Sequence, residues 1–224
     1  MKRTKIALVT PTTFEAAALK PAIETWQVTG SMRPIVSGVG ITKAAAVCKT
    51  LENGPGFEWL VLLGWAGGLD PELRIGSRVI ADQALLAGKP SLPCHPLTLP
   101  ETKVGPILTV ANALYTREDK RKARLTEALA VEMEAYPLAA WAQEKGIPFI
   151  HARVILDTAD EELPKLGDAL TPDSDLSLGR LLRLFLTRRV SIRETWRLTR
   201  RVQATNPRLN QFAYDLLSLL LSGG

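Results

Sequence analysis

The feature that most constrains the fold of this chain is the regular alternation of short apolar runs and helix-like segments over its first 160 residues. The apolar runs at residues 5–9, 59–63 and 149–156 have the length of buried strands, and segments rich in alanine or in charged residues separate them. Such alternation is typical of α/β proteins. We therefore predict a three-layer α/β sandwich around a central mixed, mainly parallel sheet.

From residue 176 the sequence pattern becomes all-helical. Residues 176–214 hold nine arginines against one acid, so they carry a local charge of +8 in a chain whose net charge is +5. The basic character therefore belongs to the C-terminal part of the chain. We predict an α/β domain over residues 1–160 and an Arg-rich helical extension over residues 161–224, packed on the same domain.

The last predicted helix has a clear apolar stripe. Asn206 and Pro207 are suited to the cap and the first turn of this helix. Apolar residues then recur every three or four positions, as on one buried face of a helix: Leu209, Phe212, Ala213, Leu216, Leu217 and Leu220.

Composition excludes several classes of protein. With 46% apolar and 23% charged residues, the chain has the balance of a globular protein. Its longest apolar stretch, residues 59–69, is too short and too rich in glycine to span a bilayer. The first residues lead into a strand without a signal-peptide pattern, so we expect a cytoplasmic protein. Two cysteines and two histidines exclude a disulfide scaffold and a multi-histidine zinc site, and we expect neither a metal nor a cofactor.

Three acidic residues lie at the ends of predicted strands: Glu15, Glu134 and Asp157. In α/β proteins ligands bind at the carboxyl ends of the strands, which meet at one edge of the sheet. Each acid alone is typical of a surface or helix-capping residue, but the shared position indicates a common site. Glu132 points to the same face of an extended segment as Glu134, so the two would repel each other unless one binds hydroxyl groups or takes up a proton.

Two glycine-containing segments are a second candidate binding feature. Gly38-Val39-Gly40 matches only the first part of a dinucleotide fingerprint, because Lys43 stands where the third glycine belongs. A tight strand-to-helix turn and a backbone cradle for a ribose or an anion are both open interpretations. In residues 64–68, a predicted turn, the small neighbours of Trp65 leave space for a flat ligand, unless Trp65 belongs to the core.

Five segments of the chain occur in the order and spacing of a known superfamily: Glu15, Ser37–Ala44, Gly64–Pro71 with Gly76, Ala130–Ala135 and Arg153–Asp160. Through them residues 5–160 resemble the nucleoside phosphorylases and methylthioadenosine/S-adenosylhomocysteine nucleosidases. Residues 131–135 together with Asp157 are the most specific part. The tail, in which residues 170–173 precede Arg-rich helices, is similar to that of the hopanoid-associated nucleoside phosphorylases. The resemblance implies a purine nucleoside phosphorylase-like fold.

The resemblance also implies roles for individual residues in cleaving the bond between ribose and purine. This cleavage develops positive charge on the ribose and negative charge on the departing base. Glu134 would grip the ribose hydroxyls, Asp157 would hold the proton for the purine N7, and Glu15 would orient the attacking water. Met133 would pack on the sugar. The other implied substrate-binding residues are Gly38, Trp65, Ala66, Gly67 and Glu132.

The chain also departs from the superfamily pattern. Trp65 replaces the serine or threonine usual in the glycine segment, and Leu156 replaces the serine usual before the catalytic aspartate. Phosphorylases of the superfamily hold phosphate with an arginine and a serine at positions that correspond to Leu62 and Trp65. We therefore expect hydrolysis by water, with phosphorolysis, in which phosphate is the co-substrate, as the alternative.

The predicted function is an enzyme that releases adenine from a 5′-substituted adenosine, and the hopanoid-associated branch suggests adenosylhopane. The alternatives are a methylthioadenosine/S-adenosylhomocysteine-type nucleosidase and a purine-nucleoside-binding protein without turnover. A Rossmann dehydrogenase is disfavoured by the incomplete glycine fingerprint. As partners we expect a small nucleoside substrate and further copies of the chain in a homo-oligomer, and no nucleic acid.

The C-terminal arginines predict a basic helix face beside an apolar stripe that includes Trp196. Drawing an apolar substrate from a membrane would favour a location peripheral to the inner membrane. A solvated helix face packed on the α/β body is the other interpretation. The arginines concerned are Arg193, Arg197, Arg200 and Arg201.

Overall fold

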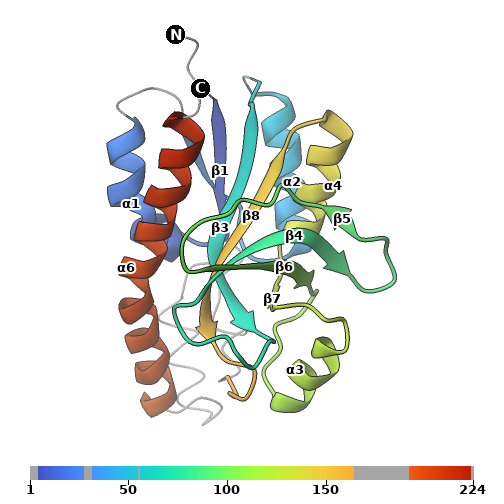
Figure 1. Ribbon diagram of the computed structural model, residues 1–224, viewed down its shortest axis with the longest axis vertical. Coiled ribbons are helices and arrows are strands. Elements are labelled where there is room, and N and C mark those ends of the chain that lie inside the picture. The colour runs from blue at the N-terminus through green and yellow to red at the C-terminus, as the bar shows by residue number, and fades with distance from the viewer. Residues whose placement is uncertain (1–4, 28–31, 55, 164–191, 223–224) are drawn as a thin grey trace.

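The computed structural model describes residues 5–27, 32–54, 56–163 and 192–222, and these form one sheet of eight strands with helices on both faces (Figure 1). In chain order the elements are β1 (Ile6–Thr10), α1 (Thr13–Gln27), β2 (Met32–Val36), α2 (Ile41–Glu52), β3 (Trp59–Gly68), β4 (Arg78–Leu86), β5 (Leu92–Pro93), β6 (Thr102–Thr109), α3 (Arg117–Arg124), β7 (Ala130–Glu132), α4 (Ala135–Lys145), β8 (Phe149–Asp157) and α6 (Ile192–Ser222).

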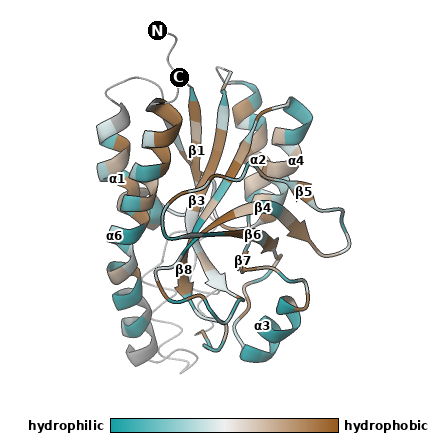
Figure 2. Ribbon diagram, viewed as in Figure 1, coloured by the Kyte–Doolittle hydropathy of each residue, from teal (hydrophilic) through white to brown (hydrophobic). Residues whose placement is uncertain are grey.

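Two helical layers enclose the sheet. Helices α1 and α6 pack together on one face, where Ile6 and Leu8 of β1 join their core. Helices α2 and α4 cover the other face, against Ala7 and Val9 of the same strand. The alternating side chains of a strand thus supply both cores, and in Figure 2 the central strands are mostly hydrophobic while α3 is hydrophilic. The predicted three-layer sandwich is confirmed.

The sheet is mixed, with the order β2-β1-β3-β7-β6-β4-β5, and β8 pairs with both β3 and β4. Five strand pairs are parallel: β1 with β2 and β3, β3 with β8, and β6 with β4 and β7. The pairs β3–β7, β4–β5 and β4–β8 are antiparallel. This arrangement confirms the mixed, mainly parallel sheet, and it places β3 and β8 side by side at its centre.

The prediction of a turn at residues 64–68 is wrong, because β3 continues through Gly68 and stays paired with β8. The glycines instead allow acidic side chains to pack directly against the strand. A methyl group on Gly64 would overlap the Glu15 carboxylate, and one on Gly67 would lie 3.2 Å from Asp157 Oδ2. The strand therefore needs glycine at the positions where the Glu15 and Asp157 side chains pack against its backbone.

Two other helices differ in length from their predicted extents. The alanine run after Glu15 predicts a helix to Leu19, but α1 continues past it and contains Pro21. The sequence predicts a charged, exposed helix over residues 116–129, but α3 ends at Arg124, and Glu127 follows with a left-handed φ of 61°. Thr116 and Asp119 predict a cap at the start of this helix, and the cap is confirmed, since the Asp119 amide donates to Thr116 Oγ1 at 3.1 Å.

Helix α6 begins at Ile192, so Pro207 lies inside a continuous helix and the predicted helix start at Asn206 is wrong. All six residues of its predicted apolar stripe are buried, which confirms the stripe. They pack against α1 and the sheet. The part of the tail before residue 192, from 164 to 191, lies outside the described residues. Among the described helices, none is long and apolar enough to cross a membrane.

Candidate active site

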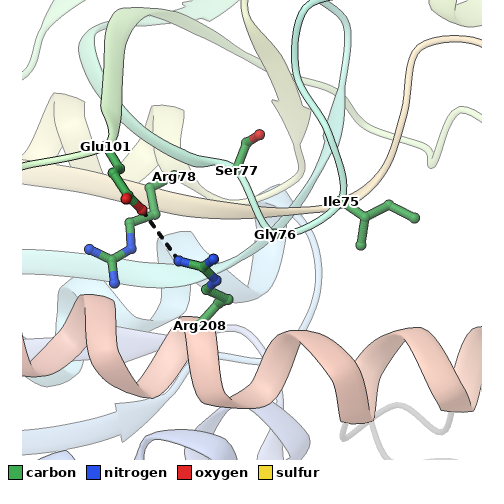
Figure 3. Close-up of a pocket in the computed structure, with 6 residues that line it drawn as sticks. All are labelled: Ile75, Gly76, Ser77, Arg78, Glu101 and Arg208. Atoms are coloured by element: carbon green, nitrogen blue, oxygen red, sulfur yellow. Dashed lines mark hydrogen bonds and ion pairs between the residues drawn. The ribbon is translucent and has the colours of Figure 1, made fainter.

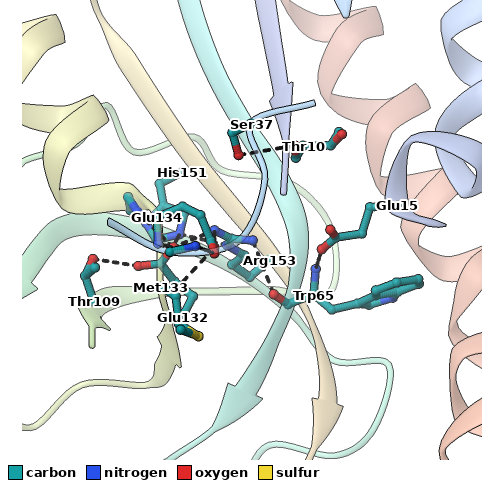
Figure 4. A network of polar contacts seen from close by, with 12 residues as sticks. Thr10, Glu15, Ser37, Trp65, Thr109, Glu132, Met133, Glu134, His151 and Arg153 are labelled. Atoms are coloured by element: carbon teal, nitrogen blue, oxygen red, sulfur yellow. Dashed lines mark hydrogen bonds and ion pairs between the residues drawn. The ribbon is translucent and has the colours of Figure 1, made fainter. Parts of the chain in front are cut away.

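Buried charged side chains gather along the C-terminal half of β3 (Figure 4). They come from α1, from β7 and the turn that follows it, and from β8. Each is at most 5% exposed: Glu15, Glu132, Glu134, Arg153 and Asp157. Burial of this many charges requires that each be paired or protonated.

Glu15 lies in the first turn of α1, where Thr12 and Glu15 form a capping box. Glu15 Oε2 accepts from the Thr12 amide at 2.8 Å and from its hydroxyl at 2.7 Å, and the Thr12 hydroxyl accepts from the Glu15 amide at 3.2 Å. Glu15 Oε1 accepts from the Trp65 amide of β3 at 2.7 Å. Burial raises the pKa of Glu15, opposed by Arg153 and these hydrogen bonds.

Arg153 is the fully buried cation of the cluster (Figure 4). Its Nη2 donates to Glu132 at 2.6 Å and to Glu134 at 3.2 Å. Its Nη1 donates to the Trp65 carbonyl at 3.2 Å, and its Nε donates to His151 Nε2 at 3.0 Å. Burial and the neighbouring Arg153 hold the pKa of His151 well below its usual value, so the imidazole is neutral and can accept this bond.

Glu132 is occupied by protein donors. Besides Arg153, it accepts from Thr109 Oγ1 at 2.6 Å and from the amides of Glu134 and Ala135 at 2.8 and 2.9 Å, at the beginning of α4. It therefore anchors Arg153 and the turn that carries Met133.

Glu134 accepts fewer hydrogen bonds from the protein than Glu132 does. Its Oε1 accepts from the Gly40 amide at 2.9 Å, which brings the Gly38–Gly40 turn beside it. Burial, followed by repulsion from Glu132, raises the pKa of Glu134 to about 8 despite Arg153. The expected repulsion between the two glutamates is thus reduced in two ways: Arg153 forms ion pairs with both, and the raised pKa of Glu134 favours its protonated, neutral form.

Asp157 lies at the end of β8 beside Gly67, and its partner is Lys120 of α3. Lys120 Nζ donates to Asp157 Oδ2, and also to the Thr158 carbonyl at 2.7 Å. Both side chains are at most 5% exposed. Burial raises the pKa of Asp157, and Lys120 opposes this shift.

The other predicted binding residues have mixed surroundings. Gly38 has a left-handed φ of 82°, and its carbonyl accepts from the Ser37 hydroxyl at 2.8 Å. Trp65 points away from Arg153 and packs on the α1/α6 side of the sheet (Figure 4). Ala66 belongs to the core under α2 and α4, whereas Gly67 adjoins Asp157. Met133 is half-buried between the two glutamates.

Sequence reasoning assigned no role to Arg153 or Lys120. For Arg153 the sequence does hold a signal, because it lies inside the apolar run of β8, four residues before Asp157. A charged side chain in a buried strand is almost always paired with an oppositely charged or hydrogen-bonding group. Lys120 had no such signal, because every position of α3 looks solvent-exposed in sequence. Within the described residues, no group of three His, Cys, Asp or Glu side chains is placed to hold a metal ion.

A cavity of about 240 Å³ lies elsewhere, between the start of β4 and α6 (Figure 3). There Arg208 forms an ion pair with Glu101 at 3.3 Å. None of the residues around the cavity belongs to the group of buried charged side chains along β3. The cavity is lined by Ile75, Gly76, Ser77, Arg78, Glu101 and Arg208.

Comparison with known proteins gives the same grouping as the motifs. The sequence profile of the Phosphorylase superfamily matches residues 93–175. A 5′-methylthioadenosine/S-adenosylhomocysteine nucleosidase of Marinomonas sp. (strain MWYL1) is 30% identical over 159 residues, which are 58% of this chain and 69% of the relative.

Solved structures share the fold at low sequence identity. A Helicobacter pylori MTAN mutant with 5′-methylthioadenosine in its active site has a TM-score of 0.61 at 19% identity, covering 72% of this chain and 88% of the other. Futalosine hydrolase of the same organism has a TM-score of 0.61 at 18% identity, covering 70% and 86%. The chain therefore belongs to the superfamily of nucleoside phosphorylases and methylthioadenosine/S-adenosylhomocysteine nucleosidases, and it is an enzyme of this group.

Proposed function

We propose that this enzyme cleaves the N-glycosidic bond of a 5′-substituted adenosine with water and releases adenine. The observation that carries the proposal is the placement of three buried acids along the glycine-rich half of β3: Glu15 and Asp157 contact the strand directly, and Glu134 is joined to it through Arg153. Each has a pKa raised by burial. Perturbed acids gathered at strand ends are typical of catalytic sites.

The chemistry assigns a different task to each acid. Glu134, neutral below about pH 8, can both donate to and accept from ribose hydroxyls. Water attacks the anomeric carbon and yields its proton to Glu15. The electron pair of the broken C–N bond moves into the base, whose N7 takes a proton from Asp157. The chain thus supplies a hydroxyl clamp, a base and an acid.

The charges favour water over phosphate as the nucleophile. Arg153 is the cation that lowers the pKa of Glu15, and the side chains of Glu132 and Glu134 already bind it. Lys120 is likewise held by Asp157. A phosphate would enter among acids without a free cation within this group of described residues, which is electrostatically costly.

The 5′ group is the part of the substrate with two supported candidates. The Marinomonas relative is a nucleosidase for 5′-methylthioadenosine and S-adenosylhomocysteine, which supports a small or amino-acid 5′ substituent. The similarity of the tail to the hopanoid-associated branch supports a long apolar one, adenosylhopane. A nucleoside-binding protein without turnover is the third candidate, and it predicts binding without release of base.

A substrate panel tests the proposal directly. We expect adenine release, followed by chromatography, from at least one of adenosine, 5′-methylthioadenosine, S-adenosylhomocysteine and an adenosine with a long apolar 5′ chain. The sugar product should be the free ribosyl compound at a rate that added phosphate does not change. A ribose 1-phosphate product that grows with phosphate would overturn hydrolysis, and binding of all four compounds without turnover would leave only the binding-protein function.

We also propose that the exposed part of α6 approaches an anionic membrane surface. Trp196 is 55% exposed, and the Arg200 guanidinium lies 3.5 Å from its ring centroid. Arg197 is exposed beside them. Arg201 instead forms an ion pair with Glu161, so it is not available to a lipid.

Vesicle co-sedimentation tests this surface. The wild type should pellet with anionic vesicles at low salt and remain soluble with neutral ones, because each arginine near an anionic surface contributes about 1 kcal/mol. An Arg197→Gln/Arg200→Gln double variant should lose most of this binding. An Arg117→Gln/Arg121→Gln variant on exposed α3 is the matched control and should behave as wild type. Equal recovery of all three proteins in the supernatant would exclude the membrane contact.

A further inference from the structure

Lys120 is the buried residue of a helix that is otherwise open to solvent. Its seven companions in α3 are exposed or half-buried, and six of them are charged. The ammonium reaches inward to Asp157 Oδ2 and the Thr158 carbonyl, and the side chain is 1% exposed. The end of β8 is thereby tied to α3.

Burying this ion pair is an energetically unfavourable way to hold a helix against the sheet. Removing an ammonium and a carboxylate from water costs several kcal/mol for each ion, and an apolar side chain of similar volume often stabilises a fold equally well. A buried lysine beside an acid in a catalytic cluster therefore points to chemistry.

We propose that Lys120 is the positioning residue of Asp157 and the source of the proton that Asp157 passes to the departing purine. This inference rests on the proposed function, in which Asp157 is the acid. In the resting pair Lys120 is an ammonium and Asp157 a carboxylate. As the glycosidic electron pair moves into the base, a proton moves from Lys120 Nζ to Asp157 and from Asp157 to N7. Lys120 is left neutral and takes up a proton from solvent after the products leave.

Among the described residues, two other charged groups act on Asp157. Glu161 follows β8, accepts from the Thr158 amide at 3.0 Å and raises the pKa of Asp157. Arg201 of α6, the partner of Glu161, lowers it. These two neighbours oppose each other, and the β3 residues beside the aspartate, Gly67 and Gly68, carry no charge. After burial, Lys120 is therefore the neighbour with the largest effect on the pKa of Asp157.

The inference predicts a distinctive pH profile. A lysine ammonium holds its proton into the alkaline range, whereas a buried carboxyl alone loses it earlier. Wild-type kcat should therefore remain on its plateau into the alkaline range. In Lys120→Gln the alkaline fall should begin at the pKa of the isolated Asp157, so that kcat at pH 9 drops about tenfold for each unit of displacement while kcat at pH 6 changes little.

The experiment measures kcat and KM for adenine release between pH 5 and pH 10. It compares the wild type, Lys120→Gln, Lys120→Arg and the exposed control Lys122→Gln, with thermal unfolding to verify folding. Lys120→Arg keeps the charge but cannot give up its proton, so kcat should be low at every pH with KM nearly unchanged. This variant also tests the inference if Lys120→Gln does not fold. Lys122→Gln should match the wild type.

Each contrary outcome has a separate meaning. An alkaline limb that moves upward in Lys120→Gln would show that Lys120 merely lowers the pKa of Asp157. An even loss of kcat without a change in profile would show a structural anchor, and a fully active Lys120→Arg would exclude proton donation. Any of these overturns the inference while an inactive Asp157→Asn preserves the proposed function. A fully active Asp157→Asn would overturn both.

Discussion

Replacing Asp157 with asparagine should lower kcat for adenine release by about 10²- to 10⁴-fold, the usual contribution of a positioned general acid. The amide keeps the shape of the side chain beside Gly67 but has no proton to give to N7. The base would then have to depart as an anion. KM should change far less than kcat, because the lost interaction forms in the transition state.

A substrate whose leaving group needs no proton separates this role from general damage to the site. Asp157→Asn should cleave 4-nitrophenyl riboside at nearly the wild-type rate, because nitrophenolate is a stable anion that leaves without a proton. Asp160→Asn, exposed three residues further on, is the matched control and should be as active as the wild type on both substrates. Wild-type adenine release by Asp157→Asn would contradict the assigned role of the aspartate.

Much of the architecture could be predicted from sequence because its signals are local. Apolar runs gave β1 and β8 nearly to the residue, Thr116 gave the cap of α3, and Gly146 ends α4 in the left-handed conformation. The positions of Glu15, Glu134 and Asp157 at strand ends followed from the same signals. Their common placement is a property of the α/β topology, not of the individual residues.

The errors arose where a distant part of the chain decides local structure. Residues 64–68 look like a turn because they are small, yet pairing with β8 extends the strand and Glu15 of α1 requires Gly64. Pro207 looks like a helix start, yet packing of the buried stripe on α1 carries a single helix through it. In both cases tertiary contacts override local preference.

The same limit explains the two cations that sequence reasoning left without a role. Arg153 depends on Glu132 and Glu134, which lie about twenty positions earlier, and Lys120 depends on Asp157, which lies thirty-seven positions later. Nothing in the neighbouring sequence of either residue reveals its partner. A site built of carboxylates could be foreseen, but not the cations that allow those carboxylates to be buried.

Removing Arg153 should have the largest effect on stability. Arg153→Met keeps an unbranched side chain but leaves Glu132 and Glu134 buried without their cation. Breaking a buried ion pair from one side costs about 3–5 kcal/mol of the free energy of unfolding. Arg121→Met, on the exposed face of α3, should change it by less than about 0.5 kcal/mol and is the control.

The loss of stability in Arg153→Met (its deficit) should also depend on pH, and the pKa values of the nearby acids determine whether it grows or shrinks as pH rises. The pKa of Glu134, about 8 in the folded chain, lies above its unfolded value, so the folded state binds more protons between the two values and loses stability as pH rises through that range. Because Arg153 lowers the pKa values of both Glu134 and Glu15, its removal raises them further. Below about pH 8 Glu134 is protonated in both proteins, and only above it does the wild type gain from an ionised Glu134 beside Arg153, so urea unfolding should show a smaller deficit at pH 7 than at pH 9.5. A deficit equal at both pH values would mean that Arg153 stabilises the fold by packing and not by its charge.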